Sequence, residues 1–159
     1  MTRIRETERK ARPSRLVSYL YIPTLFILAL SGFGQMPIYN RYYLSDIPGL
    51  GWLAYYYVTR NIHYIAAAVL LGLIFYGLFD FLFSHRRRLR LTKSGILRAA
   101  LLAGIVVSGA LIVVKNFPYV YFSDAFIIGL NIFHIAAVMT FLLTNLVCLL
   151  GKMRWTAAR

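Results

Sequence analysis

Cysteine and acidic side chains are scarce in this sequence, and their scarcity narrows the kinds of site it can build. Cys148 is the single cysteine, so the chain cannot close a disulfide on itself. It also has no CxxC pair for an iron–sulfur cluster or a structural zinc, so any such cluster must belong to another subunit. With five Asp and Glu residues against 18 Lys and Arg, the formal net charge is +13.

Long apolar stretches take up most of the chain. Hydrophobic residues make up 60% of it, and four stretches reach the roughly 20 residues that cross a bilayer as a helix. They cover 16–37, 61–83, 95–115 and 125–151. Because these stretches leave no room for a separate soluble domain, the sequence predicts one membrane domain over 1–159. The predicted fold class is all-α, a four-helix transmembrane bundle with up-down topology.

The positive charge follows the predicted loops rather than forming a nucleic-acid surface. Fifteen of the 18 basic residues fall before the first stretch, at or between the second and third, or after the fourth. Only Arg41, Arg60 and Lys115 fall on the opposite side. The positive-inside rule therefore predicts that both termini and the middle loop are cytoplasmic. The basic face is expected to bind anionic membrane lipids, with docking of an acidic partner as the less favoured alternative, and no nucleic-acid partner is expected.

Two histidines lie inside apolar stretches, in similar local sequences. His63 is part of Asn-Ile-His-Tyr-Ile-Ala-Ala, starting at Asn61, and His134 is part of Asn-Ile-Phe-His-Ile-Ala-Ala, starting at Asn131. Counted from the cytoplasmic ends of their helices at about 1.5 Å per residue, their depths agree within roughly one helical turn. An ionisable side chain inside a membrane marks a candidate functional site. Two imidazoles at one depth, on the second and fourth helices of a bundle, predict axial ligation of one haem b.

The residues around these histidines suit that ligand. Small residues that leave space for a flat macrocycle follow each histidine, namely Ala66, Ala67, Ala136 and Ala137. Arg60 and Lys115 fall near the outer interface and are candidates to pair with haem propionates. Zinc is disfavoured, because no Cys, Asp or Glu lies at this depth to complete four ligands. A histidine that only hydrogen-bonds to a neighbouring helix remains the alternative.

Short matches between the two halves of the chain indicate an internal repeat. Ser31-Gly32 matches Ser108-Gly109. The stretch beginning at Asn61 loosely matches the one beginning at Asn131, with the histidine displaced by one position. If the matches reflect a duplication, the fold is a repeated helical hairpin whose second and fourth helices are equivalent.

Three further polar residues are weaker candidates for a quinone site. Gln35 and Tyr64 fall near the predicted haem level, and Asp80 falls one turn inside the basic loop. Asp80 is interpreted first as an ion-pair partner of an arginine at 86–87 and second as a proton carrier for quinone chemistry. His85, beside the arginine run, is expected to be solvated. The sequence does not choose between the two places for a quinone.

The layout and two segments of the chain resemble the membrane cytochrome b subunits of anaerobic respiratory complexes. The resemblance rests on the four apolar stretches, on His63 and His134, and on the segments 32–43 and 47–52, which read GFGQMPIYNRYY and IPGLGW. Bacterial cytochrome b561-type proteins and formate dehydrogenase gamma subunits belong to this group. Its members commonly carry two b haems, often with a ligand on the first helix. Here the first stretch has no histidine, so one haem is expected.

The resemblance implies an electron-transfer subunit that is not catalytic alone. It implies menaquinone or ubiquinone as one partner, an iron–sulfur or multihaem redox subunit as the other, and the inner membrane of a bacterial or archaeal cell as the location. The alternative hypothesis is a haem-free scaffold subunit that assembles a complex by helix packing. A small transporter is disfavoured, because few charges lie inside the apolar stretches and no broken helix is evident beyond the Gly-Pro end of the first.

Overall fold

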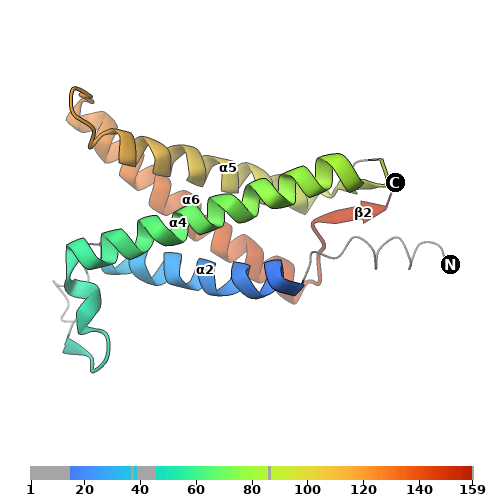
Figure 1. The fold of residues 1–159 in the computed structure, drawn as a ribbon, viewed down its shortest axis with the longest axis horizontal. Coiled ribbons are helices and arrows are strands. Elements are labelled where there is room, and N and C mark those ends of the chain that lie inside the picture. The colour runs from blue at the N-terminus through green and yellow to red at the C-terminus, as the bar shows by residue number, and fades with distance from the viewer. Residues whose placement is uncertain (1–14, 37, 39–45, 86, 159) are drawn as a thin grey trace. The chain divides into compact units, whose positions relative to one another are not determined.

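The computed structural model describes residues 15–36, 38, 46–85 and 87–158 (Figure 1). Within them lie four α-helices, α2 (Arg15–Gly34), α4 (Tyr56–Asp80), α5 (Lys93–Val114) and α6 (Asp124–Leu150). Shorter elements are the 3-10 helix η2 (Gly51–Ala54), the π-helical turn η3 (Phe81–His85) and the strands β1 (Leu89–Leu91) and β2 (Thr156–Ala158). The basic segment 1–14, Tyr39, Tyr42, Tyr43 and Arg86 lie outside the described residues.

The four predicted apolar helices are present, and three of them are long and apolar enough to cross a membrane. These three are Tyr56–Ser84, which is α4 with most of its π-helical turn, and the whole of α5 and α6. The apolar part of α2, Tyr19–Gly34, is shorter. In each long helix only 11% of the most apolar window is buried inside the structure, so most of its apolar surface is left for lipid or other helices.

The chain divides into two compact units, 1–86 and 87–159, and each contains one helical hairpin. α2 packs against α4 in the first unit, and α5 packs against α6 in the second (Figure 1). Small and hydroxyl-bearing side chains are prominent in these interfaces and let the helices approach closely. The buried residues in the described part of the four helices are Thr24, Ser31, Gly34, Thr59, Ala66, Leu70, Gly95, Arg98, Ser108, Leu130, Ala137, Phe141 and Cys148. This division agrees with the internal repeat in the sequence.

The described part of the connection in the first hairpin contains a turn followed by a short helix. Residues 47–50 turn, with Gly49 at φ +87°, and lead into η2. Leu53 of η2 is fully buried, and its carbonyl accepts a hydrogen bond from the Thr59 hydroxyl at 2.9 Å. Gly34, at the end of α2, leaves the room that Leu53 needs, since an added Cβ would lie 3.0 Å from the Leu53 carbonyl oxygen. η2 therefore closes the end of this hairpin that is nearer His63.

The second hairpin is closed at the end away from His134 by a two-stranded ribbon that the all-α prediction missed. β1 and β2 pair antiparallel over three residues each, too short for an alternating pattern to be visible in the sequence. Arg98 is 4% exposed, and its guanidinium carbon lies 4.3 Å from the centre of the Trp155 ring. Arg98 also donates to the carbonyl oxygens of Ser94 and Met153. These contacts satisfy a buried arginine and join the start of α5 to the segment after α6.

Candidate functional site

His63 of α4 is held by a serine of the helix beside it. The Nδ1 of His63 lies 2.9 Å from the Oγ of Ser31 in α2. The same hydroxyl lies 2.6 Å from the carbonyl oxygen of Ile27, one turn earlier. A Cβ added to Gly32 would lie 3.4 Å from Cε1 of His63, so the imidazole lies beside Gly32 with room for an ordinary side-chain contact. Ser31 is 1% exposed, which makes its hydroxyl inaccessible to solvent.

His134 of α6 is held in the same way by α5. Its Nδ1 lies 2.8 Å from the Oγ of Ser108, and that hydroxyl lies 2.7 Å from the carbonyl oxygen of Gly104. A Cβ added to Gly109 would lie 3.2 Å from Cε1 of His134. Ser108 is 2% exposed. Each hairpin therefore contains a Ser–His pair made of a buried serine on its first helix and a half-buried histidine on its second.

The two helices that carry the histidines also bury the same relative positions. The residues four before, three after and seven after the histidine are buried in both helices, namely Thr59, Ala66 and Leu70 in α4 and Leu130, Ala137 and Phe141 in α6. This register makes His63 and His134 equivalent at an offset of 71 residues. The match of Asn61 with Asn131 is therefore wrong by one residue, because similar apolar helices align easily by chance.

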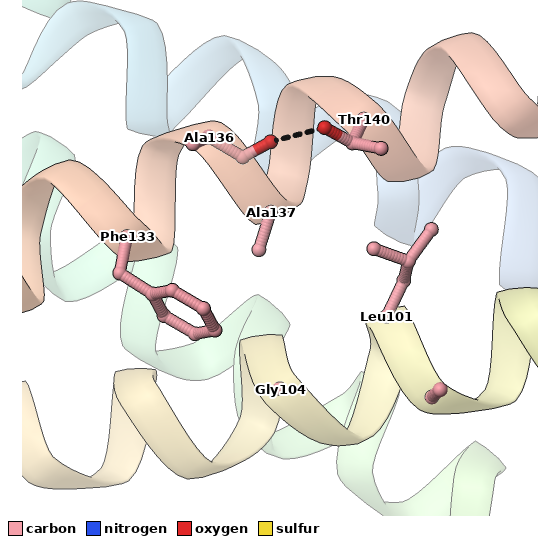
Figure 2. A pocket seen from close by; sticks show the side chains of 7 residues that line it. Leu101, Gly104, Phe133, Ala136, Ala137 and Thr140 are labelled. Atoms are coloured by element: carbon pink, nitrogen blue, oxygen red, sulfur yellow. Dashed lines mark hydrogen bonds between the residues drawn. The ribbon is translucent and has the colours of Figure 1, made fainter.

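A shallow groove lies beside the Ser–His pair of the second hairpin. It has a volume of about 350 Å³ and is lined by Ala100, Leu101, Gly104, Phe133, Ala136, Ala137 and Thr140 (Figure 2). Gly104 is one turn before Ser108, and Ala137 is one turn after His134. Ala136 and Ala137, the two alanines that follow His134, therefore line an apolar surface next to it.

Larger side chains occupy the equivalent positions of the first hairpin. When the helices are aligned on their serines and histidines, Gly104 corresponds to Ile27 and Ala136 corresponds to Ile65. Both isoleucines are partly exposed, at 41% and 68%. They add bulk to the surface where the second hairpin has a glycine and an alanine. The Ser–His pairs are thus alike, whereas the surfaces beside them differ.

Arg60 lies one turn before His63 on α4. Its guanidinium carbon is 5.5 Å from the ring centre of Tyr56 and 5.2 Å from that of Tyr57. Its buried Nε has no hydrogen-bond partner among the described residues, so it retains the capacity to bind an anionic group. Lys115, the other predicted propionate partner, is half-buried and follows the end of α5.

The three weaker candidates for a quinone site do not gather in one place. The Nε2 of Gln35 donates to the carbonyl oxygen of Ser31 at 3.1 Å, and Tyr64 is adjacent to His63, so both lie near the first Ser–His pair. Asp80 ends α4, and 17 residues of helix at about 1.5 Å per residue place it roughly 25 Å from His63. These residues therefore represent two alternative places for a quinone rather than one.

Ser31 and Ser108 are the candidate functional residues that the sequence reasoning missed. The repeated Ser-Gly pair is visible in the sequence, but nothing there links it to a histidine. The separation from serine to histidine is 32 residues in the first hairpin and 26 in the second, so no fixed motif joins them. Only the packing of the helices shows the connection.

No family model, curated protein or solved structure matches this chain. The two Ser–His pairs and the residues beside them are therefore the features of this chain that bear on its function.

Proposed function

We propose that this protein is a membrane electron-transfer subunit in which His63 and His134 ligate one haem b. The repeated Ser–His pair carries the proposal. Each hairpin sets a half-buried imidazole at the equivalent position of an apolar helix, with Nδ1 bound to a buried serine. Histidines that ligate a metal commonly engage their second ring nitrogen in this way, so that Nε2 is the nitrogen that binds the metal.

The donor set fits a haem better than a bare metal ion. Two imidazoles are a suitable pair of axial ligands for an electron-transfer haem. A closed zinc site would need four ligands, and no three His, Cys, Asp or Glu side chains gather among the described residues. The groove of small residues beside His134 offers an apolar surface for part of a planar macrocycle. When bound, the haem supplies reversible one-electron chemistry at its iron.

The residues of this chain hold and tune that cofactor and do not act on a substrate. If both His63 and His134 held the haem iron, no coordination position would be left open for a substrate. Arg60 is suited to pair with a propionate, because its buried Nε has no hydrogen-bond partner among the described residues. Lys115 is the second candidate for this pairing. On this basis the subunit is a redox carrier, and an enzyme exists only in its complex with a partner.

The proposed setting is the inner membrane of a bacterial or archaeal cell. The four helices cross it in up-down order, with both termini and the middle loop in the cytoplasm and the basic face against anionic lipids. Strongly exposed aromatic side chains at the histidine-side ends of the two hairpins, such as Tyr57 and Tyr121, support a membrane interface there.

The proposed electron partners are a quinone and a second redox subunit. Menaquinone or ubiquinone exchanges electrons on one side, and an iron–sulfur or multihaem subunit exchanges them on the other. Gln35 and Tyr64 favour a quinone place near His63, because both lie close to the first Ser–His pair. Asp80, at the other end of α4, marks the alternative place.

A reduced-minus-oxidised visible spectrum of the purified protein, with a pyridine haemochrome count, tests the proposal. We expect a b-type alpha band and one haem per chain. His63→Ala and His134→Ala should each abolish the band, because one imidazole alone leaves an axial position empty. His85→Ala is the matched control, because it removes the third histidine, which is not a proposed ligand, and should leave the band unchanged.

The other outcomes are equally informative. A folded preparation without haem would contradict the proposal and favour the haem-free scaffold that assembles a complex. Loss of half the haem in each single variant, from two per chain, would contradict a shared haem and show that each histidine serves its own. Loss in His85→Ala would show that the ligands are assigned wrongly.

A further inference from the structure

Each serine of the two Ser–His pairs has one hydroxyl hydrogen, and the distances indicate where it goes. The Oγ of Ser31 lies 2.6 Å from the Ile27 carbonyl oxygen, and the Oγ of Ser108 lies 2.7 Å from the Gly104 carbonyl oxygen. A carbonyl oxygen can only accept, and two oxygens come this close in a hydrogen bond with the hydrogen between them. Each serine therefore donates to the backbone of its own helix.

The serine oxygen is then left to accept from the histidine. The Nδ1 atoms of His63 and His134 lie 2.9 and 2.8 Å from the Oγ atoms of Ser31 and Ser108. Because the hydroxyl hydrogen is already engaged, the hydrogen of this second bond must be carried by Nδ1. In a neutral imidazole the lone pair is then on Nε2.

We propose that Ser31 and Ser108 are positioning residues that fix His63 and His134 as Nδ1–H tautomers and so present Nε2 as the ligand nitrogen. The use of this arrangement rests on the proposed haem function, whereas the tautomer follows from the serine geometry alone. A histidine ligand whose second nitrogen donates in this way has a fixed ring orientation and is a more basic donor to the metal.

The glycine after each serine lies beside the imidazole. A Cβ at Gly109 would lie 3.2 Å from Cε1 of His134, closer than ordinary contact, whereas a Cβ at Gly32 would lie 3.4 Å from Cε1 of His63, at ordinary contact distance. A flip of the ring would bring a carbon, Cδ2, to the place of Nδ1 and would leave the serine oxygen without its donor. The contact with the serine therefore selects one ring orientation as well as one tautomer.

Nuclear magnetic resonance of the full-length protein, labelled with ¹⁵N-histidine and kept reduced, tests the tautomer directly. His85→Ala serves as the background, so that two histidines contribute. We expect both rings to carry a proton on Nδ1 that exchanges slowly with solvent. Ser31→Ala should speed that exchange about tenfold for His63 and leave His134 unchanged, because it removes one buried hydrogen bond. Ser108→Ala should do the reverse.

Haem binding provides the second readout. Loss of such a supporting partner lowers metal-site affinity by about 10–100-fold, so both serine-to-alanine variants should bind haem more weakly by that factor. Ser31→Thr and Ser108→Thr, which keep the hydroxyl, should recover binding. Thr24→Ala is the matched control, because Thr24 is also buried and donates to a carbonyl one turn earlier in α2, at 2.7 Å, two turns away from Ser31.

The two proposals can fail separately. A protein without haem whose histidines still carry Nδ1 protons that depend on the serines would overturn the haem function and support the positioning role. Haem binding with protons on Nε2, or with Nδ1 protons indifferent to both serine substitutions, would overturn the positioning role. Equal losses in Thr24→Ala and Ser31→Ala would show that the serine acts through helix stability and would also overturn it.

Discussion

The α2–α4 and α5–α6 hairpins hold their histidines alike and close their ends differently. In both, the serine Oγ lies within 2.9 Å of the histidine Nδ1. The first hairpin is closed near its histidine by η2, whereas the second is closed at its far end by the β1–β2 ribbon. The second also has a groove of small residues where the first carries Ile27 and Ile65.

The comparison separates a shared feature, the Ser–His pair, from a feature that differs between the hairpins, the way in which the end of each is closed. The hydrogen bonds of the Ser–His pair recur with nearly the same distances, although η2 closes one hairpin and the β1–β2 ribbon closes the other. The Ser–His pair is thus the feature that the two hairpins share. The end closures, η2 in the first hairpin and the β1–β2 ribbon in the second, stabilise their two-helix units in different ways.

Gly95→Ala should break the closure of the second hairpin and has the largest expected effect. A Cβ at Gly95 would overlap the carbonyl oxygen of Trp155, which is backbone and cannot move aside cheaply. We expect a loss of about 2–3 kcal/mol in the free energy of unfolding, measured by denaturant titration in detergent. Gly72→Ala is the control, because nothing lies within 4 Å of its added Cβ, and helix propensity favours alanine there. Equal stability of the two variants would contradict the ribbon contact.

Gly34→Ala should loosen the closure of the first hairpin by a smaller amount. The added Cβ would lie 3.0–3.2 Å from atoms of Leu53 and Thr59, so the short helix η2 must shift by a few tenths of an ångström. We expect a loss of about 1–2 kcal/mol, with the haem spectrum retained. Gly77→Ala, with nothing within 4 Å, should be neutral or stabilising. A loss in Gly77→Ala as large as in Gly34→Ala would count against the role of η2.

Ala136→Ile copies Ile65 of the first hairpin into the groove of the second. Because Ala136 is exposed on the structure, we expect little change in stability, within about 0.5 kcal/mol. If the groove takes part of the macrocycle, haem affinity should fall at least about tenfold, equivalent to about 1.4 kcal/mol. The reverse change, Ile65→Ala, should leave affinity intact. Unchanged haem affinity in Ala136→Ile would remove the groove from the proposed site.

Gly109→Ala and Gly32→Ala should have the smallest effects of these substitutions, and they should differ in whether the neighbouring histidine ring is displaced. The added Cβ would lie 3.2 Å from the His134 ring but 3.4 Å from the His63 ring, and only the first distance is tighter than ordinary contact. Alanine has a higher helix propensity than glycine, by up to about 1 kcal/mol. Gly32→Ala should therefore leave the free energy of unfolding unchanged or raise it slightly. Gly109→Ala should displace the His134 ring, visible as a changed ¹⁵N resonance with no matching change at His63. A larger displacement of the His63 ring in Gly32→Ala than of the His134 ring in Gly109→Ala would show that the two Ser–His pairs are not packed as described.

The sequence predicted the apolar helices and singled out the two histidines within them, but it did not predict that serines hold those histidines. Apolar stretches of about 20 residues are a strong signal, and α5 and α6 begin and end within two residues of their predicted limits. α4 begins five residues early, because Tyr56–Arg60 continue the helix beyond its apolar stretch. The contact of Ser108 with His134 depends on how two helices rotate against each other, which their composition does not encode. Arg98 was also unpredictable as a buried residue, because its partner Trp155 is far away in the sequence.

Because each Ser–His pair lies within a single hairpin, the order of synthesis carries a consequence for assembly. A ribosome adds roughly 5–20 residues per second, so the first hairpin is complete several seconds before the second. His63 can therefore meet Ser31 while His134 has not yet been translated, and neither contact requires the other unit. A cofactor that arrives after translation would find both imidazoles already oriented, and its insertion would not have to compete with the folding of either hairpin.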